Sequence, residues 1–194
     1  MDEPLPAPFP GAGKDEWRTW AKGRRAQLDV AGMSDAVVSG LLAWPALRAA
    51  RTVLVYLPLP DEMDLAGLRS AGLSCRFATT RTPDRDGRLT VHDIEGPLEV
   101  HRMGFLQPHA MAPQIAPDEV DMALLPGLAF DLWGTRLGRG AGYFDEFLAA
   151  ASRSLTKVGV VPTPLVVDRL PHEAHDQQMS FLATEEGVVG VAKE

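Results

Sequence analysis

The sequence predicts an α/β protein in which helices cover both faces of a mostly parallel central sheet, giving three layers (αβα). Short apolar runs with strand character alternate along the chain with stretches of helical periodicity, and this alternation is typical of parallel sheets. The chain has 194 residues, 45% of them hydrophobic, which is enough for one sizeable core. We therefore expect a Rossmann-like domain that binds its ligands beyond the carboxyl ends of the strands.

The N-terminal part of the chain is predicted to form an arm and two helices. Residues 1–13 carry four prolines and little periodic pattern, so we expect a flexible arm ahead of a single domain at 14–194. Helical periodicity then runs from Lys14 to about Val30. The apolar residues that can share one face of this helix are Trp17, Trp20, Ala21 and Leu28. A second helix is expected from Ser34, as its N-cap, to about Leu47.

The predicted strands are short apolar runs bounded by prolines, glycines or polar residues. The clearest are Thr52–Leu57, which Pro58 closes, and Met122–Leu125, which Pro126-Gly127 ends. Further strands are expected at Ser74–Thr80, Leu89–His92, Thr156–Val161 and Phe181–Thr184. Two more helices are expected, at 64–71 and 143–152, whereas 100–117, with three prolines, is expected to be a loop.

Composition and charge disfavour several classes of protein. The formal net charge of −7 argues against nonspecific nucleic-acid binding, which needs many Lys and Arg contacts to phosphates. Cys75 is the only cysteine, so an internal disulfide is impossible and a cysteine-based metal site is disfavoured. The N-terminus lacks the pattern of a signal peptide, and no apolar run approaches the ~20 residues of a membrane span. We expect a cytoplasmic monomer that acts on a small molecule and contacts neither nucleic acid nor membrane.

The segment after the strand at 122–125 is the most informative part of the sequence. In this loop three glycines alternate with an arginine and an alanine, in the order Gly138, Arg139, Gly140, Ala141 and Gly142. Arg136 lies just upstream, and a helix begins directly afterwards. Glycines allow a close approach of the backbone, helix N-termini offer free N–H groups, and arginines offer forked donors, so the segment predicts a phosphate site. The alternative is a glycine-rich surface turn with solvated arginines, since the pattern is neither a P-loop nor a dinucleotide fingerprint.

This segment resembles the signature of the 5-formyltetrahydrofolate cyclo-ligase family, also called methenyltetrahydrofolate synthetases. That signature has Pro-Gly after a buried strand, then Phe-Asp and Gly-x-Arg-Leu-Gly-x-Gly-x-Gly-Tyr-Tyr-Asp. The matching residues are Pro126, Gly127, Phe130, Asp131, Gly134, Arg136, Leu137, Gly138, Gly140, Gly142, Tyr143, Phe144, Asp145 and Leu148. The resemblance spans about Lys14 to Gly187 and implies a related three-layer α/β fold.

The resemblance implies that the chain uses ATP, and it assigns ATP binding to two segments. Lys14 and Arg18 lie four residues apart on one helix face and match the family's ATP-contacting Lys-x-x-x-Arg pair. By themselves these two cations would be interpreted as a solvated basic edge. The signature residues expected to bind ATP are Arg136, Leu137, Gly138, Arg139, Gly140, Ala141, Gly142, Tyr143 and Phe144. Arg139, Arg136 and Lys14 are expected to act in catalysis by neutralising charge on the transferred phosphoryl group.

The resemblance also implies a reduced folate as the substrate. Glu62 follows the strand at 52–57 and matches the family's acid that contacts the pterin, whose N–H donors suit a carboxylate. The alternative for Glu62 is capping of the following helix. Leu57 and Tyr143 are expected beside the substrate. Trp133 is expected either in the wall of the folate pocket or in ordinary core packing.

Two aspartates are the expected ligands of Mg²⁺. Asp145 directly follows the glycine loop, and Asp176 lies in a segment that resembles the family's C-terminal Pro-x-x-x-His-Asp. Mg²⁺ is typically held by one or two carboxylates together with phosphate oxygens and waters. His172, His175 and Glu173 raise the alternative of zinc, which is the weaker interpretation because cysteine ligands are missing.

The activity implied by the resemblance is conversion of 5-formyltetrahydrofolate to 5,10-methenyltetrahydrofolate, with ATP going to ADP and phosphate through a phosphorylated formyl (iminophosphate) intermediate. The chain departs from many relatives at Phe144, which replaces a tyrosine, and at Gln107 and Ser180, which replace acids. The two lost charges motivate an alternative, a catalytically weakened folate- and nucleotide-binding paralogue. A third possibility is an enzyme of this fold that acts on a sugar phosphate or a CoA ester.

Overall fold

The computed structural model describes residues 6–9, 11–83 and 87–192, and within them an eight-stranded sheet forms the middle layer. Its strands are β1 (Thr52–Leu54), β2 (Arg76–Arg81), β3 (Thr90–Asp93), β6 (Gln114–Ile115), β7 (Met122–Pro126), β10 (Thr156–Val160), β12 (Phe181–Thr184) and β13 (Gly187–Gly190). They lie in the order β13-β12-β10-β7-β1-β2-β3-β6. The neighbours from β12 to β2 are parallel, whereas β13, β3 and β6 are antiparallel at the edges. The predicted mostly parallel α/β architecture is confirmed.

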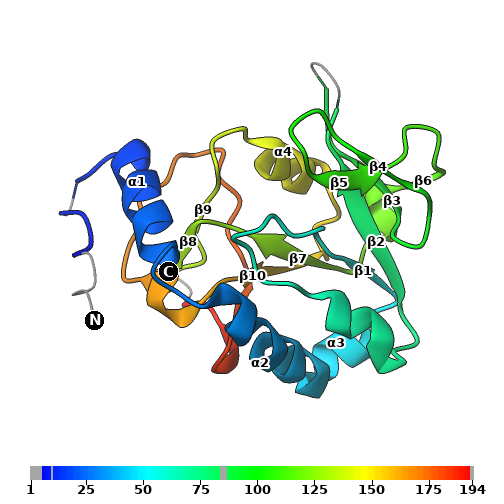
Figure 1. Cartoon of the computed structure of the whole chain (residues 1–194), viewed down its shortest axis with the longest axis horizontal. Coiled ribbons are helices and arrows are strands. Elements are labelled where there is room, and N and C mark those ends of the chain that lie inside the picture. Colours follow the sequence, from blue (N-terminus) through cyan, green and yellow to red (C-terminus); the bar gives the residue numbers. More distant parts are fainter. Residues whose placement is uncertain (1–5, 10, 84–86, 193–194) are drawn as a thin grey trace.

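Helices cover both faces of this sheet (Figure 1). The helical elements are α1 (Lys14–Arg25), α2 (Val30–Ala43), α3 (Pro45–Ala49), the 3₁₀ helix η1 (Ala66–Ala71), and α4 (Tyr143–Ala150). Apolar residues of α1 and α4 cluster with Leu125 of β7, while those of α2, α3 and η1 cluster with Leu124. Successive strand residues point to opposite faces, so the two leucines serve the two outer layers. No helix in the described part of the chain is long and apolar enough to span a membrane.

Two smaller sheets surround the carboxyl end of the main sheet. They consist of the hairpin β4 (Leu98–Val100) with β5 (Leu106–Pro108), and of β8 (Ala129–Asp131), β9 (Arg136–Leu137) and β11 (Val166–Val167). Short 3₁₀ turns, η2 (Pro117–Glu119) and η3 (Thr163–Leu165), complete the elements. The strands β8 and β9 pair antiparallel, so the beginning of the glycine signature is a short hairpin that leads into the loop before α4.

The predicted cap of the second helix is wrong. Asp29 is the N-cap of α2, because its carboxylate accepts a hydrogen bond from the Gly32 N–H at 3.0 Å. Ser34 lies inside the helix, where its buried hydroxyl donates to the Val30 carbonyl and accepts from the Asp64 N–H. The serine therefore joins α2 to the segment that precedes η1.

Several predicted helices have other bounds than the observed ones. The helix expected at 14–30 ends at Arg25, and the helix expected at 34–47 ends at Ala43, because Pro45 cannot continue its hydrogen bonds. The helix expected at 64–71 is the 3₁₀ helix η1. Residues 1–5 and 10 of the predicted arm lie outside the described residues, so its flexibility stays a prediction; Ala12 is buried in the same apolar cluster as α1.

Some strands were not predicted. The expected loop at 100–117 contains β5 and β6, the signature contains β8 and β9, and β13 follows the last predicted strand. These strands have only two to four residues each. So few residues show no usable alternation of apolar and polar side chains, and their pairing depends on the neighbouring strands.

Candidate active site

A cavity of about 940 Å³ lies at the carboxyl ends of β1 and β7. Tyr56 and Leu57 extend beyond β1, Pro126 and Gly127 end β7, and all four line the cavity. This is the edge at which parallel α/β sheets bind ligands. The predicted site residues that line the same cavity are Lys14, Arg18, Leu57, Glu62, Arg136, Leu137, Gly138, Arg139, Gly140, Ala141, Gly142, Tyr143, Phe144, Asp145 and Asp176.

Trp133 lies outside this cavity, contrary to one of its two expected placements. Its indole ring contacts the guanidinium of Arg169, whose Cζ lies 4.7 Å from the ring centroid. The position of Trp133 is set by the tight turn between β8 and β9. In that turn its N–H donates to Asp131 at 3.0 Å, and Gly134 has a positive φ of 87°.

The glycine loop 138–142 presents its backbone to the cavity. Gly140 and Gly142 have φ values of 112° and 72°, in the left-handed region that favours glycine, so side chains there would be strained. Gly142 is also the N-cap of α4. Among the described residues, no acceptor receives a hydrogen bond from the amides of 138–142. These N–H groups are therefore available for an anionic ligand at a helix N-terminus.

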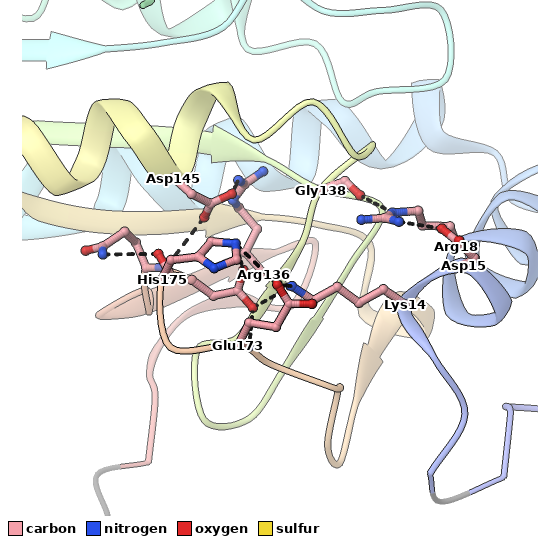
Figure 2. Close-up of polar contacts among 10 residues, drawn as sticks. Lys14, Asp15, Arg18, Arg136, Gly138, Asp145, Glu173 and His175 are labelled. Atoms are coloured by element: carbon pink, nitrogen blue, oxygen red, sulfur yellow. Dashed lines mark hydrogen bonds and ion pairs between the residues drawn. The ribbon is translucent and has the colours of Figure 1, made fainter.

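The first residues of α1 contribute two cations to the part of the cavity that the glycine loop 138–142 lines, called here the loop side (Figure 2). Lys14 Nζ lies 2.8 and 3.0 Å from the carboxylate oxygens of Asp176 and 3.5 Å from Glu173. Arg18 Nε donates to the Gly138 carbonyl at 3.1 Å, and its Nη1 lies 2.5 Å from Asp15. Burial raises the pKa of Asp176, but hydrogen bonds from Lys14 and the Glu173 N–H hold that pKa below its ordinary value.

Among the cations that line the cavity, Arg136 is the most buried, with a side chain that is 5% exposed. Its Nη2 lies 2.7 Å from Asp145 Oδ2, and its guanidinium lies 5.5 Å from the centre of the Phe144 ring. Its buried Nε has no hydrogen-bond partner among the described residues. Burial lowers the pKa of Arg136, against the opposing effect of Asp145. An arginine stays charged in such a place, so the site holds a fixed positive charge close to the glycine loop.

Arg139 connects the glycine loop to the end of β1. Its Nη2 lies 2.6 Å from Asp61 and its Nε 3.2 Å from Glu62, whose other oxygen accepts from the Leu59 N–H at 3.1 Å. Burial raises the pKa of Asp61, but the hydrogen bond from Arg139 holds it below its ordinary value. The cation expected to bind nucleotide and the acid expected to bind folate are thus in direct contact.

A buried arginine, which the sequence did not indicate, binds the backbone of two segments that flank the cavity. Arg25, 4% exposed, donates to the carbonyls of Asp61 at 2.7 Å and Gly127 at 2.6 Å. It therefore joins α1 to the carboxyl ends of both β1 and β7. A basic residue in the last turn of a helix is usually solvated, so no local pattern could have revealed this role.

A further part of the cavity lining was also not predicted. Its residues come from the end of β2, the segment before β3, and the turn of the β4–β5 hairpin. They are Thr80, Thr82, Pro83, Leu89, His101, Arg102, Met103, Phe105 and Leu106. The rings of His101 and Phe105 stack with centroids 4.4 Å apart. The sequence predicted only a loop here, because the cavity contacts of this turn depend on the pairing of β4 with β5.

Comparison with known proteins identifies the family. The model of the 5-formyltetrahydrofolate cyclo-ligase family matches residues 16–185. The chain belongs to this family. It is 26% identical to the 5-formyltetrahydrofolate cyclo-ligase of Escherichia coli K12 over 160 residues, covering 78% of this chain and 87% of that protein. The cyclo-ligase of Mycolicibacterium smegmatis is 39% identical over 74 residues, which is 38% of each chain.

Solved structures of this family share the fold. Aquifex aeolicus 5,10-methenyltetrahydrofolate synthetase superimposes with a TM-score of 0.80 at 29% identity, over 93% of this chain and 94% of that one. The synthetase of Mycoplasma pneumoniae has a TM-score of 0.70 at 18% identity, covering 88% of this chain and 97% of that one. By sequence, the chain spans only 38% of the M. smegmatis relative and 52% of the Schizosaccharomyces pombe relative.

Within this cyclo-ligase fold, the residues expected to hold Mg²⁺ lie on the loop side of the cavity. Asp145 and Asp176 both line it, and carboxylate oxygens are ligands that Mg²⁺ prefers. Asp176 also forms a group with Glu173 and His175, whose ligand atoms lie within 4.8 Å of one another. The Lys14 ammonium contacts both acids of this group, so the two carboxylates already have a cationic partner. A metal ion bound here would share these carboxylates with Lys14.

The two departures from the cyclo-ligase pattern that remove a charge lie outside the cavity. Gln107 is buried, accepts from the Thr82 N–H at 3.2 Å, and donates to Glu99 at 3.2 Å. Ser180 donates its backbone N–H to the Lys157 carbonyl at 2.7 Å. In this chain the first residue holds the β4–β5 hairpin against the end of β2, and the second directly precedes β12, where its carbonyl also accepts from the Val191 N–H.

Proposed function

We propose that the protein converts 5-formyltetrahydrofolate to 5,10-methenyltetrahydrofolate, with ATP going to ADP and phosphate. One observation carries the proposal: a single cavity contains both the arginine-flanked glycine loop and the acid Glu62 beside the apolar Leu57. Membership of the cyclo-ligase family supports it. The two departures at Gln107 and Ser180 lie away from the cavity, which weakens the case for an inactive paralogue.

The chemistry needs an activated formyl oxygen. A formyl group on nitrogen is amide-like, and its oxygen is a poor leaving group. Transfer of the terminal phosphoryl group of ATP to that oxygen gives an iminophosphate, a better electrophile. The second folate nitrogen then attacks the formyl carbon, the carbon–oxygen bond breaks, and phosphate leaves as that nitrogen loses its proton. Both nucleophiles belong to the folate, so the protein needs no nucleophilic side chain.

The residues around the glycine loop provide what phosphoryl transfer requires, which is alignment and neutralisation of spreading negative charge. The free amides of 138–142 and the cations Arg136, Arg139, Lys14 and Arg18 would hold the phosphates. Asp145 and Asp176 would hold Mg²⁺, which, when bound, would add positive charge next to the phosphate oxygens. Glu62 would accept hydrogen bonds from the pterin, with Leu57 and Tyr143 as its neighbours.

A spectrophotometric assay tests this function. Purified protein is mixed with 5-formyltetrahydrofolate and Mg-ATP, and methenyl product is followed by its absorbance, with a control that lacks ATP. We expect product only when ATP is present. Folate binding without product would support the paralogue instead, and neither binding nor product would favour an enzyme for a sugar phosphate or CoA ester. The cytoplasmic location and the monomeric state stay predictions.

A further inference from the structure

The cations that line the cavity differ in whether they have a partner. Among the described residues, the lysine and arginine side chains that line it are Lys14, Arg18, Arg102, Arg136 and Arg139. All except Arg102 form an ion pair with an aspartate at 2.5 to 2.8 Å. Arg102, in the turn of the β4–β5 hairpin, forms no hydrogen bond or ion pair with any described residue. It can therefore bind an anion without displacing an acid of the described part of the chain.

The segment that carries this arginine is rich in exposed apolar side chains. Of the eight large hydrophobic residues that are exposed in the described part of the chain, five lie between Leu98 and Met111. Two of them, Met103 at 76% exposure and Leu106 at 50%, line the cavity. Exposed hydrophobic residues normally occur singly on a protein surface. A group of them in one segment is therefore typical of a binding site. The hairpin thus offers apolar side chains and a single positive charge to the cavity.

The hairpin is held firmly at its base. Arg81 at the end of β2 forms an ion pair with Glu99 of β4 and donates to the Pro108 carbonyl at 2.9 Å. The side chain of Gln107 joins the same Glu99 to the Thr82 backbone. The turn that carries Arg102 is therefore supported by the main sheet. Figure 1 shows this hairpin and α1 on opposite sides of the molecule, so the turn lies away from the cations of α1.

We propose that the β4–β5 turn is the subsite for the aryl-glutamate tail of the folate, with Arg102 paired to a tail carboxylate. This inference rests on the proposed function. A reduced folate joins a pterin to a benzoyl ring and then to glutamate, so an apolar surface followed by one cation matches the tail in order. The adenine of ATP carries no negative charge, so it cannot form an ion pair with an unpaired guanidinium. The triphosphate matches the other end of the cavity, where four cations gather around the glycine loop.

Steady-state kinetics on substrates with and without the tail charge test the subsite. The variants are Arg102→Ala and, as a matched control, Arg153→Ala, which removes an exposed arginine outside the cavity. The substrates are 5-formyltetrahydropteroate, which lacks glutamate, and the monoglutamate and triglutamate forms of 5-formyltetrahydrofolate. Loss of a charge-assisted hydrogen bond predicts that Arg102→Ala raises KM for the glutamate forms about tenfold, with kcat and the KM for ATP little changed. The effect on the pteroate should be much smaller, and Arg153→Ala should match wild type on all three.

Three outcomes decide the matter. A rise in KM confined to the glutamate forms supports the subsite. An equal change on the pteroate and the glutamate forms, or no change on either, overturns the subsite while leaving the proposed function intact. If the wild-type protein turns over none of the three substrates, the proposed function fails, and this inference fails with it.

Discussion

The cations near the glycine loop and the cation in the β4–β5 hairpin differ in whether a carboxylate is paired with them. Around the glycine loop every described lysine and arginine that lines the cavity is paired with a carboxylate, whereas Arg102 in the hairpin has no partner among the described residues and lies in a segment rich in exposed apolar side chains. An anionic ligand that binds near the glycine loop must displace those carboxylates from the cations and take their place. Such an exchange is favourable for a highly charged triphosphate with its metal and unfavourable for a singly charged anion. The pairing therefore favours nucleotide at one end and leaves the other end for a weakly charged, apolar group.

The buried pair at the loop end gives the largest expected effect. Arg136→Met should lower the free energy of unfolding by about 3 kcal/mol, because it leaves the mostly buried Asp145 carboxylate, 16% exposed, without its partner. The double variant Arg136→Met/Asp145→Leu should recover much of that loss, since no uncompensated charge remains. Urea unfolding of both variants, with the slope of the transition checked against wild type, measures the difference. A single variant as stable as wild type would show that the pair contributes nothing to the fold.

Arg139 gives the next largest effect, and here the expected change is in activity. Arg139→Ala should leave the fold intact and reduce turnover by at least ~10²-fold, as expected for loss of one donor that stabilises transition-state charge. Circular dichroism and the methenyl assay measure the two quantities, with Arg153→Ala as the control. Turnover close to wild type in Arg139→Ala would contradict its role at the phosphates.

The Lys14–Asp176 pair should make stability depend on pH. The folded-state pKa of Asp176 lies below its ordinary value of 3.8, so the stabilisation is present above that value and is lost as the pH falls through the lowered pKa. Lys14→Met should reduce the free energy of unfolding by about 1 kcal/mol at neutral pH, as for a partly exposed ion pair. Urea unfolding between neutral and acidic pH should show the difference from wild type shrinking at the acid end. A difference that stays constant with pH would mean that the loss arises from packing.

The smallest expected effect tests the carboxylate exchange itself. Asp61→Asn removes an acid that competes with the nucleotide for Arg139, while keeping the backbone carbonyl that Arg25 binds. Since the pair is partly exposed, we expect Mg-ATP to bind only about threefold more tightly. Calorimetry measures the change, and Glu95→Gln, which removes the partner of Arg69 outside the cavity, serves as the control. Weaker binding in Asp61→Asn would mean that the aspartate assists the ligand.

The parts of the fold and of the candidate site that could be predicted from the sequence are those marked by short, continuous sequence patterns. The glycine loop, Lys14 and Arg18, and the acid Glu62 were identifiable because each belongs to a short ordered motif that matches the family. Strands such as β7 were identifiable from a continuous apolar run.

The remainder of the site depended on contacts between distant segments. Arg25 acts through carbonyls that lie 36 and 102 positions away in the chain, and Arg102 reaches the cavity only because β4 pairs with β5. For Trp133 the sequence left both the pocket wall and core packing open, and the residue, in the tight turn before Gly134, is not among those that line the cavity. The cap at Asp29 was missed because Ser34, a common capping residue, instead bonds to the Asp64 backbone.

The most direct test is a crossed binding measurement by isothermal titration calorimetry. Mg-ATP and 5-formyltetrahydrofolate are each titrated into wild type, Arg139→Ala and Arg102→Ala. We expect Arg139→Ala to weaken nucleotide binding about tenfold or more and folate binding much less, as for one lost charge-assisted contact, with the reverse pattern for Arg102→Ala. No uptake of Mg-ATP by the wild-type protein, or equal losses of both ligands in both variants, would contradict a cavity with separate nucleotide and folate ends.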